Sequence, residues 1–369
     1  MHIGIDARLT HYRQAGISQY ILQLIEGLAR CETEDQFTIL QSYKSKEPLL
    51  HRPNFKRRLL FTPSHHRLEQ FTLPIEISPL RLDLLHSPDF IPPLRRPRSC
   101  ASVITIHDLV FMLYPHFLTK KAAHYYGQID QAVLHTDAII AVSHATKQDI
   151  MRLLGVPERK ITVIHEAASP IYRPIKSEDV RGRVRARFGI HSPFLLFVST
   201  IEPRKNVPTL LRAFRWLLDH YHPAVKLVLA GEKGWLYEDV MQLLGELKLE
   251  EEVIFLGRVS SEELLWLYNA AEVLVAPSIY EGFGLTPLEA MACGTPVVVS
   301  NVSAFPEVVG DAGLLVDPHN VEELAIAIWR ILDDPDLRAS LVEKGLRRAA
   351  TFSWDKAAQE TLALYHSLG

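Results

Sequence analysis

Short apolar runs rich in β-branched residues alternate with amphipathic stretches along the whole chain. Six such runs in the first half predict strands at residues 2–6, 37–43, 83–87, 102–106, 137–143 and 161–165. Five more in the second half predict strands at residues 194–200, 226–231, 253–257, 273–278 and 296–300. The stretches between most of them, such as 17–29 and 120–135, have the period of a helix. Strands joined by helices indicate parallel sheets covered on both faces, so the pattern predicts an α/β protein with two doubly wound domains.

The boundary between the two series falls in residues 166–180, a segment with two prolines and no clear period. We therefore expect a first domain at 1–172 and a second at 173–351. The remaining residues, 352–369, contain a capping Ser353 and one apolar face, which predict a final helix.

Polar residues follow several of the predicted strands. Doubly wound sheets bind ligands in the crevice beyond the carboxyl ends of their strands, so these positions are candidates for a site. They are Asp6-Ala7-Arg8, His107-Asp108, Ser143-His144, 199–205, 231–233 and Tyr280-Glu281. If the two domains face each other, these strand ends line one interdomain cleft.

The composition is that of an ordinary globular protein, with 47% hydrophobic and 22% charged residues in a chain of 369. No run approaches the roughly 18 apolar residues that a membrane-spanning helix needs, and the first residues lack the apolar core of a signal peptide. Three scattered cysteines, Cys31, Cys100 and Cys293, have no metal-ligand spacing. They fit a reducing compartment, so we expect a cytoplasmic protein.

The charge is unevenly distributed. Residues 1–175 contain 21 Lys and Arg against 16 Asp and Glu, whereas the remainder contains 19 against 27. Basic clusters occur at 55–58 and 94–98 in the first half. They fit a solvated surface, or a face that meets anionic lipid or an anionic acceptor. Nucleic acid is not expected, because the clusters are short and no recognised binding motif accompanies them.

Two cations, Arg204 and Lys205, lie between a predicted strand and a predicted helix. Adjacent cations on a loop are often merely solvated. At the carboxyl end of a strand they can instead neutralise a diphosphate, Arg through its planar fork and Lys as a point charge. A metal-like pattern, Asp334-Pro335-Asp336, lies between two helical patterns, where it is typical of a stop and a cap, so we expect no metal site.

Residues 280–300 combine a glycine-rich turn with the start of a helix. Thr286 to Glu289 match a capping box with Pro287 at the first helical position. Gly282 and Gly284 allow close backbone approach, and a helix start presents free N–H groups to an anion. Glu281, just before this turn, is better suited to hydroxyl groups beside a phosphate. Together these features suggest a nucleotide-sugar site.

Residues 255–328 resemble the donor half of the family 4 retaining glycosyltransferases. The family signature of a glutamate, seven residues and a second glutamate is matched by Glu281 and Glu289, and "PRKN" at 203–206 resembles its diphosphate-binding pair. "TIHDL" at 105–109 and "AVSHATKQDI" at 141–150 resemble the acceptor half of a bacterial subgroup that includes O-antigen mannosyltransferases. The resemblance implies the GT-B architecture of two facing Rossmann-like domains, with the last helix crossing back onto the first domain.

The resemblance also implies roles for individual residues. Arg204 and Lys205 would hold the donor diphosphate, Glu281 the transferred sugar, and Glu289 the ribose. The remaining donor contacts would be Gly16 in the first loop, Val259 beside the nucleobase, and the backbone N–H groups of Phe283, Gly284, Leu285 and Thr286. His107 would lie near the 6-hydroxyl of the sugar or near the acceptor, although a histidine after an apolar strand is often just a satisfied buried side chain. Two departures, a single glycine in the first loop and Ser199-Thr200 in place of Gly-Arg, weaken the assignments in those loops.

The implied reaction is a retaining hexosyl transfer that needs no cofactor and no metal. The donor would be a GDP- or UDP-sugar, with GDP-mannose favoured, and the acceptor a glycan or a polyprenyl-diphosphate-linked glycan. The basic first half is compatible with peripheral contact with an anionic membrane at its cytosolic face. A non-catalytic sugar- or nucleotide-binding protein and a nucleotide-sugar epimerase remain as alternatives.

Overall fold

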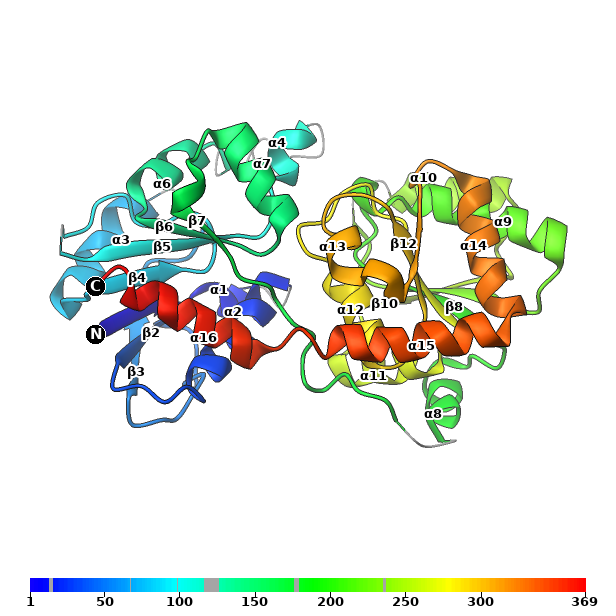
Figure 1. Cartoon of the computed structure of the whole chain (residues 1–369), viewed down its shortest axis with the longest axis horizontal. Helices are drawn as coiled ribbons and strands as arrows, with labels where there is room; N and C mark the ends of the chain where they lie inside the picture. The colour runs from blue at the N-terminus through cyan, green and yellow to red at the C-terminus, as the bar shows by residue number, and fades with distance from the viewer. Residues whose placement is uncertain (13–15, 67, 98, 116–125, 176–178, 235–236) are drawn as a thin grey trace. The chain divides into compact units, whose positions relative to one another are not determined.

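The computed structural model describes residues 1–12, 16–66, 68–97, 99–115, 126–175, 179–234 and 237–369. The chain divides into two compact units, which consist of residues 1–166 with 353–369, and of residues 167–352 (Figure 1). The first change of unit therefore lies six residues before the predicted position. Within the described ranges, no helix is long and apolar enough to cross a membrane.

The first unit is built on a seven-stranded parallel sheet in the order β3-β2-β1-β4-β5-β6-β7. Its strands are β1 His2–Asp6, β2 Gln36–Ser42, β3 Phe55–Leu60, β4 Leu84–Ser87, β5 Ala101–Ile106, β6 Ala138–Ala141 and β7 Ile161–Val163. Its helices are α1 Leu9–Tyr12, α2 Gly16–Leu28, α3 Glu69–Ile77, α4 Val110–Leu113, α6 Ile129–His135, α7 His144–Leu154 and α16 Trp354–His366. Part of the predicted helix 120–135 lies outside the described residues, and α6 forms its end.

Side chains alternate between the two faces of this sheet. Ile104 and Ile106 of β5 pack with α6 and α7, and Leu85 of β4 packs with α3. Thr105 and His86 point to the other face, where they meet α2 and α16. Helices therefore cover both faces, as expected for a parallel sheet whose strands are nearly continuous apolar runs.

The final helix, α16, belongs to the first unit. Ser353 caps it by accepting the N–H of Lys356 at 3.1 Å, as its sequence predicted. It packs against α2 so closely that a Cβ on Gly27 would lie 2.8 Å from the carbonyl oxygen of Trp354. At its other end, the Tyr365 hydroxyl is 2.6 Å from Nδ1 of the buried His86.

The second unit is built on a six-stranded parallel sheet in the order β10-β9-β8-β11-β12-β13. Its strands are β8 Phe194–Val198, β9 Lys226–Ala230, β10 Val253–Gly257, β11 Val273–Ala276, β12 Val297–Ser300 and β13 Leu314–Val316. Its helices are α8 Asp179–Phe188, α9 Val207–Tyr221, α10 Tyr237–Glu246, α11 Ser261–Ala270, α12 Leu285–Ala292, α13 Phe305–Val309, α14 Val321–Asp333 and α15 Pro335–Ala349. Asp334 caps α15 by accepting the N–H of Asp336 at 3.0 Å, which confirms the capping interpretation of 334–336.

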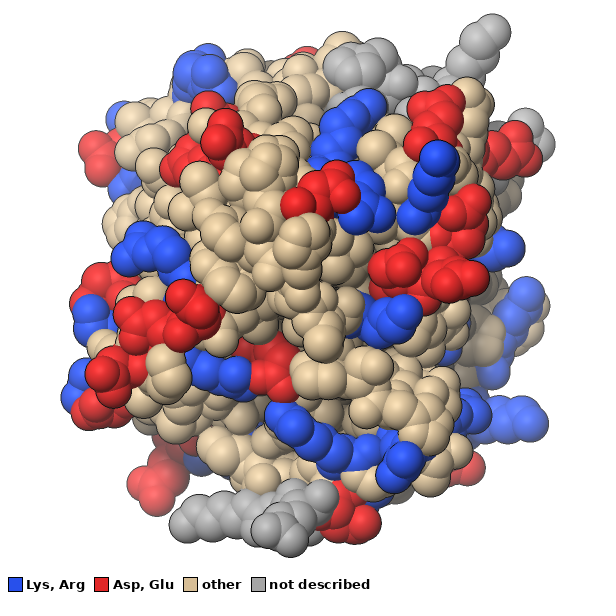
Figure 2. All heavy atoms as spheres, turned by 90° about the vertical axis from the view of Figure 1, so that its right-hand side faces the viewer, with Lys and Arg blue, Asp and Glu red and all other residues tan. Residues whose placement is uncertain are grey.

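The two sheets confirm the predicted α/β class, but the pattern missed one edge strand in each of them. β3 contains Lys56, Arg57 and Arg58, so it lacks the continuous apolar run by which the other strands of this sheet were predicted. Cations on an edge strand are a common protection against pairing with another chain, because an edge presents unpaired backbone groups. The basic cluster at 55–58 is therefore part of the sheet. The face of the second unit that is shown in Figure 2 carries both signs of charge interspersed, as expected of a solvated surface.

Candidate active site

The loop after β8 carries the two adjacent cations on a fixed turn. Arg204 and Lys205 lie in a short 3₁₀ turn, Pro203–Lys205, and Asn206 follows it with a left-handed φ of 58°. Asparagine tolerates this conformation better than most residues. Its side-chain amide donates to the carbonyl of Pro277 at 3.0 Å, just beyond β11. The turn is thereby tied to the end of the neighbouring strand.

Glu281 lies in the loop after β11 and meets both cations. Its Oε2 accepts from Arg204 at 2.9 Å, and its Oε1 accepts from Nζ of Lys205 at 2.5 Å and from Oγ of Ser278 at 2.8 Å. Its own backbone N–H donates to Oγ of Ser303 at 2.9 Å. Backbone and side chain are therefore both held, and Glu281 has one orientation toward the two cations.

The charges in this cluster compensate one another. Burial alone would raise the pKa of Glu281, but the charges of Lys205 and Arg204 outweigh it and bring the pKa to about 2. Burial and the neighbouring Arg204 together lower the pKa of Lys205, although Glu281 opposes them. A second carboxylate, Glu202, lies 2.6 Å from Nε of Arg204. Two half-buried cations thus face carboxylates for which an incoming anion can substitute.

The topology explains why these residues meet although more than seventy positions separate them along the chain. The strand order of the second sheet reverses between β8 and β11, which are neighbours and parallel. The carboxyl ends of both strands lie at the same edge of the sheet, and such a switch point is the usual ligand site of a doubly wound fold. The structure therefore confirms the location that the strand ends predicted for Arg204, Lys205 and Glu281.

The capping box predicted at Thr286 to Glu289 is wrong. Helix α12 starts two residues earlier, at Leu285, with Gly284 as its cap residue and no side-chain cap. Gly284 has a φ of 106°, and a Cβ there would lie 2.9 Å from the ring of Phe305. Because glycine sets the turn, Thr286 becomes the second helical residue. The first N–H groups of the helix, from Leu285 and Thr286, have no intrahelical partner and suit an anion.

Glu289 is bound to the preceding helix instead of to the cap. Its Oε2 accepts from the hydroxyl of Tyr268 in α11 at 2.8 Å. Burial, followed by the charge of Glu289, raises the pKa of Tyr268 far above its ordinary value. The ring of Tyr172 packs edge-on against Tyr268 at 5.4 Å. Glu289 therefore has a polar partner inside the second unit.

The other residues that the sequence predicted to contact the donor nucleotide-sugar are less closely grouped. Phe283 is buried in the turn before α12, with its ring 5.7 Å from Phe352. Val259 is half-buried between β10 and α11. Gly16 is the exposed first residue of α2 in the first unit, and a Cβ there would meet nothing within 4 Å. Residues 13–15 of the same loop lie outside the described residues.

His107 belongs to the first unit, where both of its ring nitrogens are used. Nδ1 lies 2.9 Å from Oε1 of Glu166, and Nε2 lies 2.9 Å from the carbonyl oxygen of Pro88. A carbonyl and a carboxylate both accept, so the doubly protonated imidazolium satisfies both partners. Burial would lower the pKa of His107, but the hydrogen bond and charge of Glu166 outweigh it and raise the pKa.

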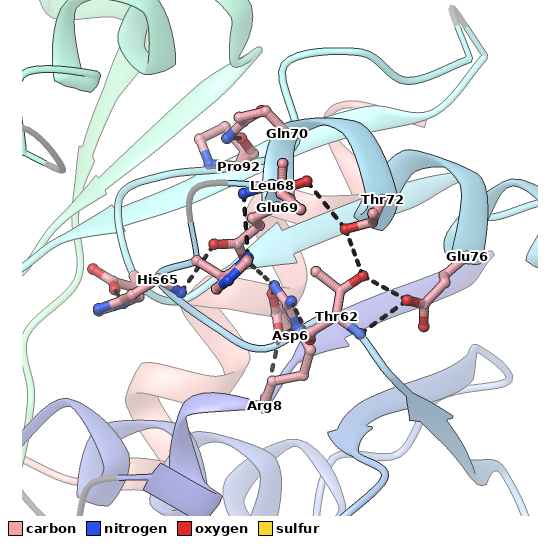
Figure 3. A network of polar contacts seen from close by, with 12 residues as sticks. Asp6, Arg8, Thr62, His65, Leu68, Glu69, Gln70, Thr72, Glu76 and Pro92 are labelled. Carbon is pink, nitrogen blue, oxygen red and sulfur yellow. Dashed lines mark hydrogen bonds and ion pairs between the residues drawn. The ribbon is translucent and has the colours of Figure 1, made fainter.

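The strand-end residue Arg8 is also occupied within the first unit. Its guanidinium is 1% exposed and bonds Asp6, Glu69 and the carbonyl of Thr62 (Figure 3). The distances from Arg8 are 2.6 Å to Oδ2 of Asp6 and 2.9 Å to the Thr62 oxygen. The bonds of Arg8 thus all run to partners inside the first unit.

Several residues of the cluster were missed from sequence. Ser278, Ser303 and Asn206 each bond the loops that carry the charges, and Tyr268 bonds Glu289. Asn206 directly follows the two cations, so its position was a usable signal. The serines gave none, because a hydroxyl after an apolar strand is too common to single out.

Family models match both halves of the chain. The family described as "Glycosyl transferases group 1" matches residues 183–348, and "Glycosyltransferase Family 4" matches residues 15–170. An O-antigen chain mannosyltransferase B from Escherichia coli is 31% identical over 377 residues, which cover 97% of each chain. The similarity therefore extends through both units.

Two solved structures share the fold over the whole chain. A sucrose-phosphate synthase from Thermosynechococcus elongatus has a TM-score of 0.80 at 24% identity, covering 100% of this chain and 99% of its own. The Anabaena protein HepE, solved in complex with UDP and glucose, has a TM-score of 0.78 at 20% identity and full coverage of both chains. At this level of identity the likeness shows the fold alone, and it supports the GT-B architecture.

Proposed function

The chain belongs to the group 1, family 4 glycosyltransferases, and from this premise we propose that it transfers a mannosyl unit from GDP-mannose to a glycan. The transfer retains the configuration of the sugar and uses no metal. The acceptor is free or linked to a polyprenyl diphosphate, and the reaction takes place in the cytoplasm. The three cysteines, all free thiols, support that compartment.

The observation that carries this proposal is the cluster of Arg204, Lys205 and Glu281 at the switch point of the second sheet. A donor diphosphate brings negative charge to the two cations and can take over the position that Glu281 now holds. The freed carboxylate is then available to accept hydrogen bonds from sugar hydroxyls. Binding and sugar recognition are thus coupled through one side chain.

The same cluster accounts for the chemistry. When the bond between sugar and phosphate breaks, negative charge grows on the leaving diphosphate. Arg204, Lys205 and the start of α12 are preorganised donors for that charge, which is the role a metal ion has in other transferases. The acceptor hydroxyl attacks the anomeric carbon from the face that the diphosphate leaves, and its proton passes to the leaving phosphate oxygen.

The remaining roles follow from the family resemblance. Glu289 binds the ribose in exchange for its bond to Tyr268, and Val259 lies beside the nucleobase. Phe283, Gly284, Leu285 and Thr286 offer backbone N–H groups, and Gly16 approaches the phosphates. His107 faces the sugar or the acceptor as an imidazolium. Because both of its nitrogens are engaged, it acts by charge and shape, without exchanging a proton.

The choice of sugar and base rests on the relatives. The name of the Escherichia coli relative supports mannose, and the UDP complex of HepE keeps a UDP-linked hexose as the second candidate. The test is a panel of GDP- and UDP-sugars, incubated with and without acceptor glycans. We expect the enzyme to release GDP from GDP-mannose, and to do so faster when an acceptor is present. The product should have the same anomeric configuration as the donor.

Other outcomes of the same assay separate the alternatives. Preference for a UDP-sugar would change the proposed donor but not the proposed transferase activity. Interconversion of sugar epimers would identify an epimerase, and tight nucleotide-sugar binding with no turnover would identify a binding protein. Full activity in the presence of a strong chelator is expected, and loss of activity that Mg²⁺ or Mn²⁺ restores would contradict metal independence.

A further inference from the structure

Helix α3 turns its polar side chains toward the protein. Glu69 bonds the buried arginine described above, and the amide of Gln70 bonds two backbone groups within segment 92–94 at 3.1 and 2.9 Å. Glu76 accepts the backbone N–H of Thr62 at 2.9 Å (Figure 3). Both carboxylates of the helix are therefore directed inward and already bonded.

The same helix turns large apolar side chains toward solvent. Leu68 directly precedes the helix, and Phe71 and Ile75 follow it at spacings of three and seven, so the three form one stripe. Phe71 is 62% exposed and Ile75 73% exposed. Leu73 and Ile77, on the other side, are buried in the core. A surface helix normally places charged or polar residues outward, whereas the outward face of α3 is apolar.

Two aromatic residues extend the stripe beyond α3. Phe61, just after β3, is 71% exposed, and its backbone N–H is bonded to Glu76 of the helix at 2.7 Å. Its ring stacks on that of Tyr43, just after β2, with centroids 5.1 Å apart. We call Tyr43, Phe61, Leu68, Phe71 and Ile75 the α3 patch. Folding does not explain such a concentration of exposed apolar surface, which commonly marks an interaction site.

The segments around the α3 patch are mainly positively charged. Residues 43–81 contain eight Lys and Arg but three Asp and Glu, and two of those three acids are the inward Glu69 and Glu76. Nζ of Lys44 lies 5.8 Å from the centre of the Tyr43 ring. Lys56 and Arg58 on the edge strand β3 are exposed. This differs from the interspersed charges in Figure 2 and is complementary to an anionic surface.

We propose that the α3 patch docks on a membrane that contains anionic phospholipid. Phe61, Phe71 and Ile75 would enter the boundary between headgroups and acyl chains, where aromatic and aliphatic side chains of amphipathic elements are stabilised. Lys44, Lys56 and Arg58 contact lipid phosphates. The excess of positive charge favours this occupant over a second copy of the chain, which would bring the same cations to the interface.

The α3 patch lies at the edge of the first sheet where a ligand is expected. Tyr43 and Phe61 follow the carboxyl ends of β2 and β3, the edge of the first sheet at which doubly wound folds bind ligands. Docking there brings that edge to the lipid surface from which a lipid-linked acceptor extends. Only this role of the contact, access to a lipid-linked acceptor, rests on the proposed function. The contact itself does not, because binding to lipid does not require turnover.

The test is co-sedimentation with vesicles of phosphatidylcholine, alone or mixed with phosphatidylglycerol. We expect the wild type to bind the anionic vesicles, and Phe71→Ser/Ile75→Ser to bind at least about tenfold more weakly, since two inserted side chains lose their apolar burial. Ile326→Ser, an exposed isoleucine on α14 of the second unit, is the matched control and should bind like the wild type. Lys56→Ser/Arg58→Ser should weaken binding about fivefold per cation at low salt.

Two results would overturn the proposal: anionic vesicles that do not bind the wild type, or equal binding of the wild type and Phe71→Ser/Ile75→Ser. A wild-type dimer in sedimentation velocity that this double variant converts to a monomer would assign the patch to a second copy instead. Turnover with a water-soluble acceptor should be unchanged in the double variant. An inactive wild type that still binds vesicles through the patch would contradict the proposed function and leave this inference standing.

Discussion

Each unit carries a cluster of arginine and carboxylates at the carboxyl edge of its sheet, next to the switch point. In the first unit Arg8 is 1% exposed, and it has two carboxylate partners and a carbonyl. In the second unit Arg204 is 21% and Lys205 13% exposed; both cations contact the carboxylate of Glu281, and Arg204 also contacts Glu202. The charge types and the topological position are the same, but the second cluster contains two adjacent cations and is more accessible to solvent.

The difference distinguishes a structural cluster from the proposed ligand site. A fully buried cation is closed to a ligand, and its partners hold segments of chain together. In the first unit they join β1 to the segment that leads into α3 (Figure 3). Two adjacent cations with a shared carboxylate repel each other, and an anion relieves that repulsion. Position at a switch point therefore makes a residue a candidate for ligand binding, and its access to solvent and the presence of a second cation separate the two clusters.

The largest expected effect is on stability, from removal of the buried guanidinium. Arg8→Met leaves Asp6 and Glu69 buried without their cation, and breaking a buried pair in this way costs about 3–5 kcal/mol. Burial already raises the pKa of Glu69 against the opposing charge of Arg8, so the variant should lose more stability as the pH rises above the ordinary range of a glutamate. Urea denaturation at pH 5 and pH 8 measures both effects.

A second variant keeps this comparison testable if Arg8→Met does not fold. Arg8→Met/Glu69→Gln removes one of the two unpaired charges and should recover part of the lost free energy of unfolding. A loss below about 1 kcal/mol in Arg8→Met would mean that the cluster is not structural, because surface pairs have that magnitude.

The next effect is on turnover, in the second cluster. Removal of a preorganised donor to a developing charge typically lowers kcat by about 10²–10³. We expect that loss for Arg204→Ala and for Lys205→Ala in the nucleotide-release assay, with a urea midpoint close to that of the wild type. Turnover near the wild-type rate in either variant would remove the distinction between the two clusters.

The sequence predicted the central strands and the position of the second cluster, but not how its charges pair. Buried strands are continuous apolar runs, so β8 and β11 could be located, together with the polar residues after them. That Glu281 faces Arg204 and Lys205 depends on β8 and β11 being neighbours, which the order of strands along the chain does not state. The apparent capping box failed for a local reason: the left-handed Gly284 starts α12 before Thr286 can cap it.

A third prediction concerns the pH dependence of the second cluster. The pKa of Glu281 is lowered to about 2 by its two cations, so its ionised form is stabilised by folding. This contribution is complete above the ordinary pKa of about 4.3 and is lost as the pH falls toward 2. The difference in Tm between the wild type and Glu281→Gln should therefore shrink over this range. A difference in Tm that stays constant from pH 6 to pH 3 would contradict the pairing.

The smallest expected effect comes from the third hydrogen bond to Glu281. Ser278→Ala removes the hydroxyl that donates to Oε1 at 2.8 Å but leaves both cations in place. A hydrogen bond to a charged group contributes about 1.5–3 kcal/mol, and Glu281 keeps both cations, so we expect a loss at the lower end of this range although Ser278 is buried. If Glu281 leaves the cations when the donor binds, this bond is present only in the free enzyme. The variant should then bind the donor somewhat more tightly, with a lower KM and nearly unchanged kcat. A raised KM would instead mean that Ser278 and Glu281 stay together in the complex, and that Glu281 contacts the sugar without leaving Lys205.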